Sequence, residues 1–379
     1  MLTIAVTAER EDEPRVAVSP ETVRKLKGLG VAVRVQKGAG TRSRFADDML
    51  AAQGAEIAPT AAEALAGADI LVKVRRPSLE EVKSLKSGAI VAAMLAPYDD
   101  RAGLEALAGT GASLMAMEFM PRISRAQSMD VLSSQANLAG YKAVIDAAAM
   151  FGQALPLMMT AAGTVPAAKV FVMGVGVAGL QAIATARRLG AIVSATDVRP
   201  ATKEQVASLG AKFIAVEDEE FKQAQTAAGY AKPMSAEYQR KQAELVASHI
   251  KGQDIVITTA LIPGRPAPRL VTTAMVESMK PGSVIVDLAA ERGGNCELTE
   301  PGKVVEHAGV KIAGPLNLAG EVPVNASSLY AKNLLAFLET MLDKKEKVLK
   351  VNWDDELIKG TLVARDGKIV HPSLQQAGA

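Results

Sequence analysis

A short apolar segment followed by three closely spaced glycines constrains this chain more than any other feature. Residues 170–173 (Val-Phe-Val-Met) have the composition of a buried strand, and Gly174, Gly176 and Gly179 follow at once. An Ala-rich segment of helical character comes next, and a second apolar run then ends in Asp197. This order predicts a strand, a tight turn, a helix and a second parallel strand, which together begin a doubly wound α/β domain.

Each glycine has a physical task in such a turn. Gly174 permits the tight bend, Gly176 lets the backbone approach a pyrophosphate, and Gly179 lets the helix pack closely on the strand. The unpaired N–H groups at the start of the helix favour phosphate. The sequence therefore predicts a dinucleotide site, and the alternative is a packing motif that holds no ligand.

Asp197 indicates which dinucleotide the site prefers. A carboxylate at this position accepts hydrogen bonds from the adenosine ribose hydroxyls and repels the 2′-phosphate of NADP, so the pattern favours NAD(H). Arg199 complicates this interpretation, because a nearby arginine can accommodate a 2′-phosphate.

Short apolar runs alternate with amphipathic segments along most of the chain, which predicts two Rossmann-like α/β domains with mainly parallel sheets. The expected strands are residues 3–7, 31–35, 70–73, 89–94 and 113–116 in the first region, and 169–174, 192–197, 212–216, 255–259, 283–287 and 310–312 in the second. The expected helices include residues 20–29 after Ser19 as N-cap, residues 46–52 and residues 179–189.

The remaining helices and the C-terminal tail suggest how the domains connect. Ser133 or Ser134 is expected to cap a long helix that runs to about Phe151, and Ser327 or Ser328 to cap a helix over residues 329–342. Asp366-Gly367 between two alternating segments predicts a hairpin. We expect the last 50 or so residues to pack on the first domain. The expected domains are residues 1–136 with 328–379, which makes the first domain discontinuous, and residues 137–327.

Composition excludes several classes of protein. Lys and Arg (43) nearly balance Asp and Glu (41), and aromatic residues make up only 3%, which argues against a nucleic-acid-binding protein. A single cysteine, Cys296, excludes an internal disulfide and a cysteine-based metal site, and no metal is expected. The first residues lack the pattern of a signal peptide. The uncharged residues 147–168 and 170–186 are interrupted by glycines and prolines, so we expect buried structure there and no transmembrane segment.

Residues 217–240 contain few apolar side chains and predict a mobile loop. Tyr230 in this loop is a candidate for covering a bound ligand, and the alternative is a solvated insertion.

Acid and base groups are scarce. We expect His249 and His307 at helix ends and His371 in the tail, which makes each a surface or capping residue. Lys73, at a strand end, is the one plausible acid or base in the first region. A reaction that moves only a hydride, such as transfer between two nicotinamides, needs neither group.

Residues 121–137 (PRISRAQSMDVLSSQAN) offer several polar groups ahead of the long helix. Arg122 and Asp130 are spaced so that they could pair, and Gln127 and Ser133 could hydrogen-bond a carboxamide. The alternative is a loop with ordinary salt bridges and a helix cap.

Three runs, PRISRAQSMDVLSSQANLAGYKAVIDAA, MMTAAGTVPAAKVFVMGVGVAGLQAIATARRLGA and TTALIPGRPAP, resemble the NAD(H)-binding component of proton-translocating nicotinamide nucleotide transhydrogenase. The resemblance covers essentially the whole chain and looks like the form in which this component is a separate α subunit. It implies a homodimer that binds NAD(H) and docks on an NADP(H)-binding component, carried by membrane-spanning proton-channel subunits. Hydride would then pass directly between two nicotinamides, coupled to proton movement. A cytoplasmic protein, peripheral on the membrane through its partners, is expected.

The resemblance also implies site residues. Those expected around the nicotinamide are Arg122, Gln127, Asp130 and Ser133, with Tyr230 in AGYAKPM as the residue of the mobile loop. The other cofactor-binding positions expected are Gly174, Val175, Gly176, Val177, Ala178, Gly179, Asp197, Val198, Arg199, Ala260 and Leu261.

The chain more distantly resembles alanine dehydrogenase. The Arg and Lys that bind the oxo acid in that family match Arg15 and Lys73, but its catalytic His falls at Met94 and an acidic catalytic position falls at Glu291. The loss of the His removes the expected proton donor, so Arg15 and Lys73 are expected to be structural and paired with a carboxylate. An alanine dehydrogenase-like amino-acid dehydrogenase and a non-catalytic NAD sensor remain the alternatives to a transhydrogenase subunit.

Overall fold

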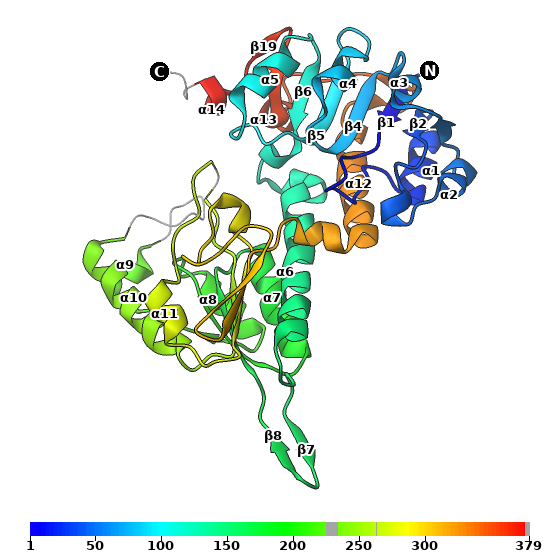
Figure 1. The fold of residues 1–379 in the computed structure, drawn as a ribbon. Coiled ribbons are helices and arrows are strands. Elements are labelled where there is room, and N and C mark those ends of the chain that lie inside the picture. The colour runs from blue at the N-terminus through cyan, green and yellow to red at the C-terminus, as the bar shows by residue number, and fades with distance from the viewer. Residues whose placement is uncertain (225–233, 263, 376–379) are drawn as a thin grey trace. The chain divides into compact units, whose positions relative to one another are not determined.

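The chain forms two compact units in a computed structural model that describes residues 1–224, 234–262 and 264–375 (Figure 1). The first unit combines Met1–Gln135 with Gly320–Ala379, and the second is Ala136–Ala319. The second boundary lies at 319/320 rather than the expected 327/328, because the helix that returns the chain to the first unit begins earlier than its sequence pattern indicates.

The described part of the first unit contains an eight-stranded sheet in the order β19-β18-β6-β5-β4-β1-β2-β3. Its strands are β1 (Thr3–Val6), β2 (Ala32–Gln36), β3 (Glu56–Ala58), β4 (Ile70–Arg75), β5 (Ile90–Met94), β6 (Ser113–Ala116), β18 (Leu362–Arg365) and β19 (Lys368–Ile369). Neighbours among β1–β6 pair in parallel, whereas β18 pairs antiparallel with both β6 and β19. The expected α/β class and the return of the tail to the first unit are therefore confirmed.

Helices cover both faces of this sheet. They are α1 (Pro20–Gly28), α2 (Asp47–Ala52), α3 (Ala61–Leu65), α4 (Leu79–Lys83), α5 (Arg101–Ala108), α12 (Pro323–Glu339), α13 (Glu356–Thr361) and α14 (Pro372–Gln375). Successive residues of a strand point to opposite faces, so Val72 packs in the core with α1 and α12, while Leu71 packs in the core with α3, α4 and α5. Burial on both faces explains why these strands read as continuous apolar runs. A short antiparallel pair, β16 (Leu342–Asp343) and β17 (Val348–Leu349), follows α12.

The second unit has a seven-stranded sheet within the described residues, in the order β11-β10-β9-β12-β13-β15-β14. Its strands are β9 (Lys169–Met173), β10 (Ile192–Thr196), β11 (Lys212–Phe213), β12 (Ile255–Thr258), β13 (Val284–Asp287), β14 (Val304–His307) and β15 (Val310–Ala313). All neighbours are parallel except β14 and β15. Both sheets thus share the doubly wound order that the alternating pattern predicts.

The helices of the second unit sandwich its sheet. They are α7 (Val177–Arg188), α8 (Thr202–Ser208), α9 (Glu219–Lys222), α10 (Ala236–Ile250) and α11 (Thr273–Glu277). Val172 packs on one face with α7 and α8, and Phe171 packs on the other face with α10 and α11. The last residues of the second unit form a 3₁₀ turn, Leu318–Glu321, that leads to α12.

The long helix α6 (Val131–Met150) begins before the expected serine caps. The carboxylate of Asp130 accepts the N–H of Ser133 at 2.9 Å, so Asp130 caps the helix and Ser133 lies in its first turn. Aspartate competes well with serine for this position because its charge also favours the helix N-terminus.

Helix α12 likewise begins before the expected caps, at Pro323. Proline suits the first turn because its φ is already helical and no N–H is lost from a hydrogen bond. Ser327 is not a cap: its buried hydroxyl accepts the N–H of Val16 at 3.0 Å and lies 2.7 Å from the Ser43 hydroxyl.

The uncharged segment after α6 is exposed, which contradicts the expectation of buried structure. It forms a hairpin of β7 (Met158–Thr160) and β8 (Gly163–Val165) that projects from the second unit (Figure 1). Leu157 and Met159 are 61% and 82% exposed. Within the described ranges, none of the helices combines the length and the apolar character that crossing a bilayer needs.

Two smaller expectations were also wrong. His307 ends strand β14 instead of a helix, because a reverse turn at Ala308 and Gly309 makes β14 and β15 a hairpin. Residues 217–240 are not one continuous loop, since α9 lies within them and α10 begins at Ala236 after the Ser235 cap.

Candidate functional site

The carboxyl ends of four parallel strands meet at one edge of the second sheet. Met173 of β9 lies level with Thr196 of β10 and Thr258 of β12, and Thr258 lies level with Asp287 of β13. The chain leaves β9 toward β10 on one side and reaches β12 on the other, so this edge is a topological switch point. Open α/β sheets bind their ligands at such points.

The three glycines form the tight turn that the sequence predicts. Gly174 has φ +100, which L side chains rarely adopt, and its N–H donates to the carbonyl of Thr196 at 2.9 Å. A Cβ on Gly179 would lie 1.9 Å from the carbonyl oxygen of Gly174. Helix α7 can therefore sit this close to the end of β9 only with glycine at position 179.

Gly176 differs from its neighbours, since a Cβ there would meet no protein atom within 4 Å. It is the N-cap of α7, its backbone is extended, and no side chain caps the helix. The first N–H groups of α7, at Val177 and Ala178, thus begin a helix beside open space, where the helix dipole favours negative charge. This geometry fits the pyrophosphate of a dinucleotide.

Asp197 follows β10 directly and is the most highly bonded group at this edge. Its Oδ2 accepts the N–H of Val175 at 2.7 Å, which ties it to the glycine turn. The guanidinium of Arg199 donates to both carboxylate oxygens at 2.9 Å, and the N–H of Arg199 donates to Oδ1 at 2.9 Å. Val198, between them, is 45% exposed.

Residues after β12 complete the edge, and a side chain that the sequence analysis missed holds them. Asn295 accepts the N–H of Ala260 at 3.0 Å and donates to its carbonyl at 2.9 Å. Thr259 donates to the carbonyl of Gly174 at 3.0 Å, while Leu261 is 53% exposed. The backbone of Ala260 is therefore fixed beside the glycine turn.

Asp287 is a second residue that the sequence analysis missed. It is fully buried and accepts hydrogen bonds from Thr258, Ala289, Asn295, Cys296 and Thr299. The available signal was its place at a strand end, the same as that of Asp197. Because all five donors belong to this chain, Asp287 stabilises the edge and is not exposed to a ligand.

In the first unit, the polar residues 121–130 form an exposed loop that ends in a 3₁₀ helix, Ser124–Met129. Arg122 and Gln127 are exposed, whereas Ala126 and Met129 are buried. Asn333 of α12 donates to the carbonyl of Ser128 at 2.8 Å and accepts from Ser134 at 2.7 Å. Asn333, which the sequence analysis also missed, therefore holds the loop against the unit.

Asp130 and Ser133 form a local pair at the start of α6. Besides the backbone contact, the hydroxyl of Ser133 donates to Asp130 Oδ2 at 2.6 Å. The pairing of Asp130 with Arg122 stays a prediction. Arg125, close by in the same loop, pairs with Asp355 at 2.8 Å.

The structure thus brings the predicted residues together in two groups, one in each unit. The glycine turn, Asp197, Arg199 and Ala260 share one edge of the second sheet, and Asp130 and Ser133 share the first turn of α6. Tyr230 lies outside the described residues.

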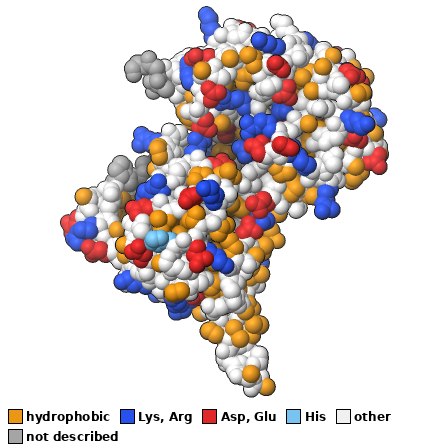
Figure 2. Space-filling model, viewed as in Figure 1, with side chains coloured by type: hydrophobic (Ala, Val, Ile, Leu, Met, Phe, Trp, Pro, Cys, Tyr) orange, Lys and Arg blue, Asp and Glu red, His pale blue; other side chains and the backbone are white. Residues whose placement is uncertain are grey.

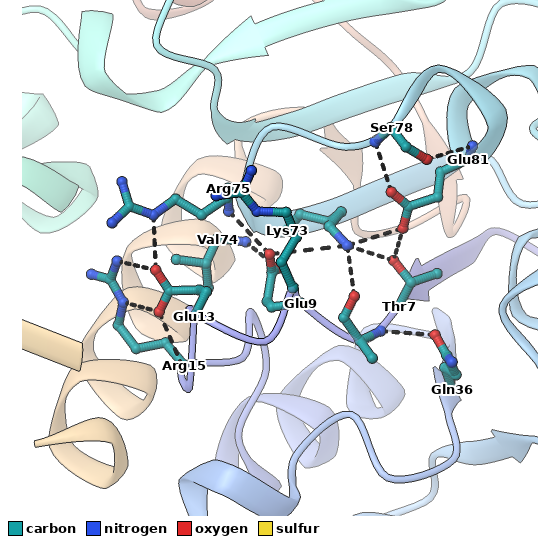
Figure 3. Close-up of polar contacts among 12 residues, drawn as sticks. Thr7, Glu9, Glu13, Arg15, Gln36, Lys73, Val74, Arg75, Ser78 and Glu81 are labelled. Carbon is teal, nitrogen blue, oxygen red and sulfur yellow. Dashed lines mark hydrogen bonds and ion pairs between the residues drawn. The ribbon is translucent and has the colours of Figure 1, made fainter. Parts of the chain in front are cut away.

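A buried ion network occupies the corresponding strand ends of the first unit (Figure 3). The ammonium of Lys73 donates to the Thr7 hydroxyl at 3.0 Å, the Ala8 carbonyl at 2.9 Å and Glu81 at 2.9 Å. An ammonium has three protons, and all three have an acceptor here. Lys73 is therefore held as a structural cation.

Arg15 is held in the same way. Its guanidinium bonds both oxygens of Glu13, at 2.7 and 2.6 Å, and donates to Gln135 at 2.8 Å. Arg75 adds a further contact to Glu13 at 2.8 Å (Figure 3). Both candidate basic residues are thus paired with carboxylates of the first unit.

The network shifts the acidity of its carboxyl groups in opposite directions. Burial would raise the pKa of Glu13, but the hydrogen bonds and charges of Arg15 and Arg75 outweigh burial and lower this pKa to about 2. Burial raises the pKa of Glu9 despite the charge of Lys73, whereas the balance of burial and Lys73 lowers the pKa of Glu81.

The lowered pKa of Glu13 predicts an acid-sensitive first unit. Glu13 stabilises the fold above its ordinary pKa of 4.5, and this contribution of about 3 kcal/mol is lost as the pH falls from 4.5 toward 2. The Glu13→Gln variant should therefore show a shallower fall in the free energy of unfolding between pH 4.5 and 2.5. Urea unfolding followed by fluorescence measures this, because Trp353, the single tryptophan, lies in the first unit.

The raised pKa of Glu9 acts above pH 4.5 and so leaves this window to the lowered groups. Glu80→Gln, at an exposed glutamate of the same unit, is the matched control. Equal slopes for Glu13→Gln and the control would contradict the role given to Glu13.

Comparison with known proteins matches both units. Residues 5–139 match the family described as alanine dehydrogenase/PNT, N-terminal domain, and residues 143–372 match alanine dehydrogenase/PNT, C-terminal domain. The chain is 58% identical to the first of the chains that make up NAD(P) transhydrogenase subunit alpha in Rhodospirillum rubrum. The match extends over 382 positions and covers 99% of this chain and 100% of that relative.

Solved structures and a second group of relatives agree. The crystal structure of transhydrogenase from Sinorhizobium meliloti superposes with a TM-score of 0.89 and 60% identity, covering 97% of this chain and 100% of that chain. Alanine dehydrogenase 1 of Staphylococcus aureus is 31% identical and covers 93% of the chain and 91% of the relative. These findings confirm the resemblance: the chain belongs to the alanine dehydrogenase/PNT family, as a homologue of NAD(P) transhydrogenase alpha subunits.

Proposed function

We propose that this chain is the NAD(H)-binding subunit of a proton-translocating nicotinamide nucleotide transhydrogenase. The observation that carries the proposal is the glycine turn of the second unit, with its open position at Gly176 and Asp197 at the adjacent strand end. The proposal rests equally on the full-length identity to transhydrogenase alpha subunits. Bound NADH would supply the hydride.

The charge of Asp197 supports NAD(H) rather than NADP(H) on this chain. A carboxylate at the end of the second strand accepts ribose hydroxyls and repels a 2′-phosphate. NADP(H) would then be held by a separate component, and hydride would pass directly between the two nicotinamides. A membrane-spanning component would couple this transfer to proton movement.

The shortage of acid and base groups favours a reaction that moves only hydride. Lys73 has donated all three of its protons, and His249 is bonded to Ser194 in the last turn of α10. His307 pairs with Glu277 and His371 bonds the carbonyl of Gly360. Transfer between two nicotinamide rings needs no group to donate a proton.

The residues of the first unit would act on the nicotinamide. The hydroxyl of Ser133 gives its proton to Asp130, so its oxygen is left as an acceptor for a carboxamide N–H. Asp130 would fix that orientation together with Arg122, and Gln127 would reach toward the facing NADP(H). Tyr230 would cover the bound cofactor as part of the mobile loop.

We further propose that the chain is a homodimer that attaches to the cytoplasmic face of the membrane through its partners. The β7–β8 hairpin supports the dimer, because Leu157, Met158 and Met159 expose apolar side chains on a projection that its own unit does not cover (Figure 2). Exposed apolar groups of this kind are typical of a protein interface.

An amino-acid dehydrogenase that acts on alanine and pyruvate is the second candidate, because the chain is also similar to alanine dehydrogenase. It would need a proton donor, and Lys73 is the only one the sequence offers in the first region. A non-catalytic NAD sensor is the third. It would bind NADH without transferring hydride to any acceptor.

The proposal predicts hydride transfer that depends on a partner. NADH and an NADP analogue, mixed with this chain and a purified NADP(H)-binding component of a transhydrogenase, should react, and omission of either protein should abolish the reaction. Stopped-flow absorbance of the reduced analogue measures the rate.

Pyruvate with ammonia provides the parallel acceptor. Oxidation of NADH by this pair without a partner would contradict the transhydrogenase assignment and favour the dehydrogenase. NADH binding without transfer to either acceptor would favour the sensor.

Asp130→Asn should slow hydride transfer about 10- to 100-fold while NADH affinity changes by less than about threefold. An amide can accept only one of the two hydrogen bonds from Ser133, so the Ser133 hydroxyl loses its fixed orientation. Single-turnover rates and NADH titration separate the two effects. Asp366→Asn, at an exposed position of the same unit, is the control, and equal losses of rate and affinity would contradict the orienting role.

A further inference from the structure

Arg199 occupies the acceptor positions that a ribose would need. The carboxylate of Asp197 receives four hydrogen bonds: the N–H groups of Val175 and Arg199 use one position on each oxygen, and the guanidinium uses another on each. An ionised carboxylate has about four lone-pair sites. All of the acceptor capacity of Asp197 is therefore in use.

The two kinds of donor differ in how easily they can leave. The two N–H groups belong to the backbone of the glycine turn and of the segment after β10, so they stay. The guanidinium is on a long side chain that is 30% exposed, and partly exposed ion pairs are weak because water competes for both partners. The hydroxyls of a ribose could replace the guanidinium but not the backbone donors.

The guanidinium also changes the charge at this position. Paired with Asp197, it cancels much of the negative charge that would repel a 2′-phosphate, and an arginine fork is itself a good phosphate ligand. It also donates to the Val175 carbonyl at 3.1 Å, which keeps it over the glycine turn.

We propose that Arg199 competes with the adenosine ribose for Asp197 and thereby weakens the preference of this site for NAD(H) over NADP(H). The inference rests on the proposed function, since it assumes a dinucleotide at the glycine turn. Arg199 is on this account a specificity-determining residue that lowers NADH affinity, and it is not a contact that NADH requires.

The test is a titration of the full chain with NADH and with NADPH, followed by cofactor fluorescence. Arg199→Ala should bind NADH about two- to fivefold more tightly and NADPH about two- to fivefold more weakly, so the ratio of affinities should change about tenfold. Opposite signs for the two cofactors separate this effect from general damage to the site. Arg188→Ala, which removes the same charge at the far end of α7, should change neither affinity.

Arg199→Lys keeps the charge but loses the planar fork, so it should raise NADH affinity while NADPH affinity stays near that of the wild type. It also provides the test if Arg199→Ala does not fold, which the thermal melting of each variant shows. Unchanged or weaker NADH binding by a folded Arg199 variant would overturn the competition. Failure of the wild-type chain to bind NADH would instead overturn the proposed function, and the inference with it.

Discussion

The contact between Gly179 and the carbonyl oxygen of Gly174 sets the geometry of the second unit's binding edge. Any side chain at position 179 would place a Cβ 1.9 Å from that oxygen, so only glycine lets α7 begin directly against the end of β9. The close approach brings the first N–H groups of the helix to the same edge as Asp197 and Ala260. The pyrophosphate, ribose and loop positions of the proposed site all depend on this one packing distance.

The two units show how one strand order serves two purposes. In the second unit, glycines leave space at the end of the central strand. In the first unit, β1 is followed by Thr7, Ala8 and Glu9, and the equivalent strand ends are filled by the bonded Lys73 and Glu81. Similar topology therefore gives an open edge in one unit and a stabilising ion network in the other, and side-chain volume and charge decide which.

The sequence predicted most strands because both faces of each sheet are covered, which makes the strands continuous apolar runs. It did less well where two residue types compete for one task. Asp130 outcompetes Ser133 as the cap of α6, and Pro323 begins α12 while Ser327 bonds inside the core.

Sequence patterns also fail where the contact comes from far along the chain. Asn295 braces Ala260 across 35 positions, and Asn333 holds the Ser128 loop across 205 positions. Neither residue belongs to a periodic pattern, so only the fold reveals its role. The β7–β8 hairpin was missed for a different reason: an uncharged segment reads as buried even when a projection exposes it.

The most direct measurement of the central claim is the NADH affinity of Gly176→Ala. The new methyl group would meet no protein atom within 4 Å, so the melting temperature should stay unchanged. A pyrophosphate close to this backbone would meet the methyl group, and NADH affinity should fall about tenfold or more, as expected for an overpacked contact. Gly152→Ala, also open on all sides, should leave the affinity unchanged. Unaltered NADH binding by Gly176→Ala would show that the dinucleotide does not lie on this glycine turn.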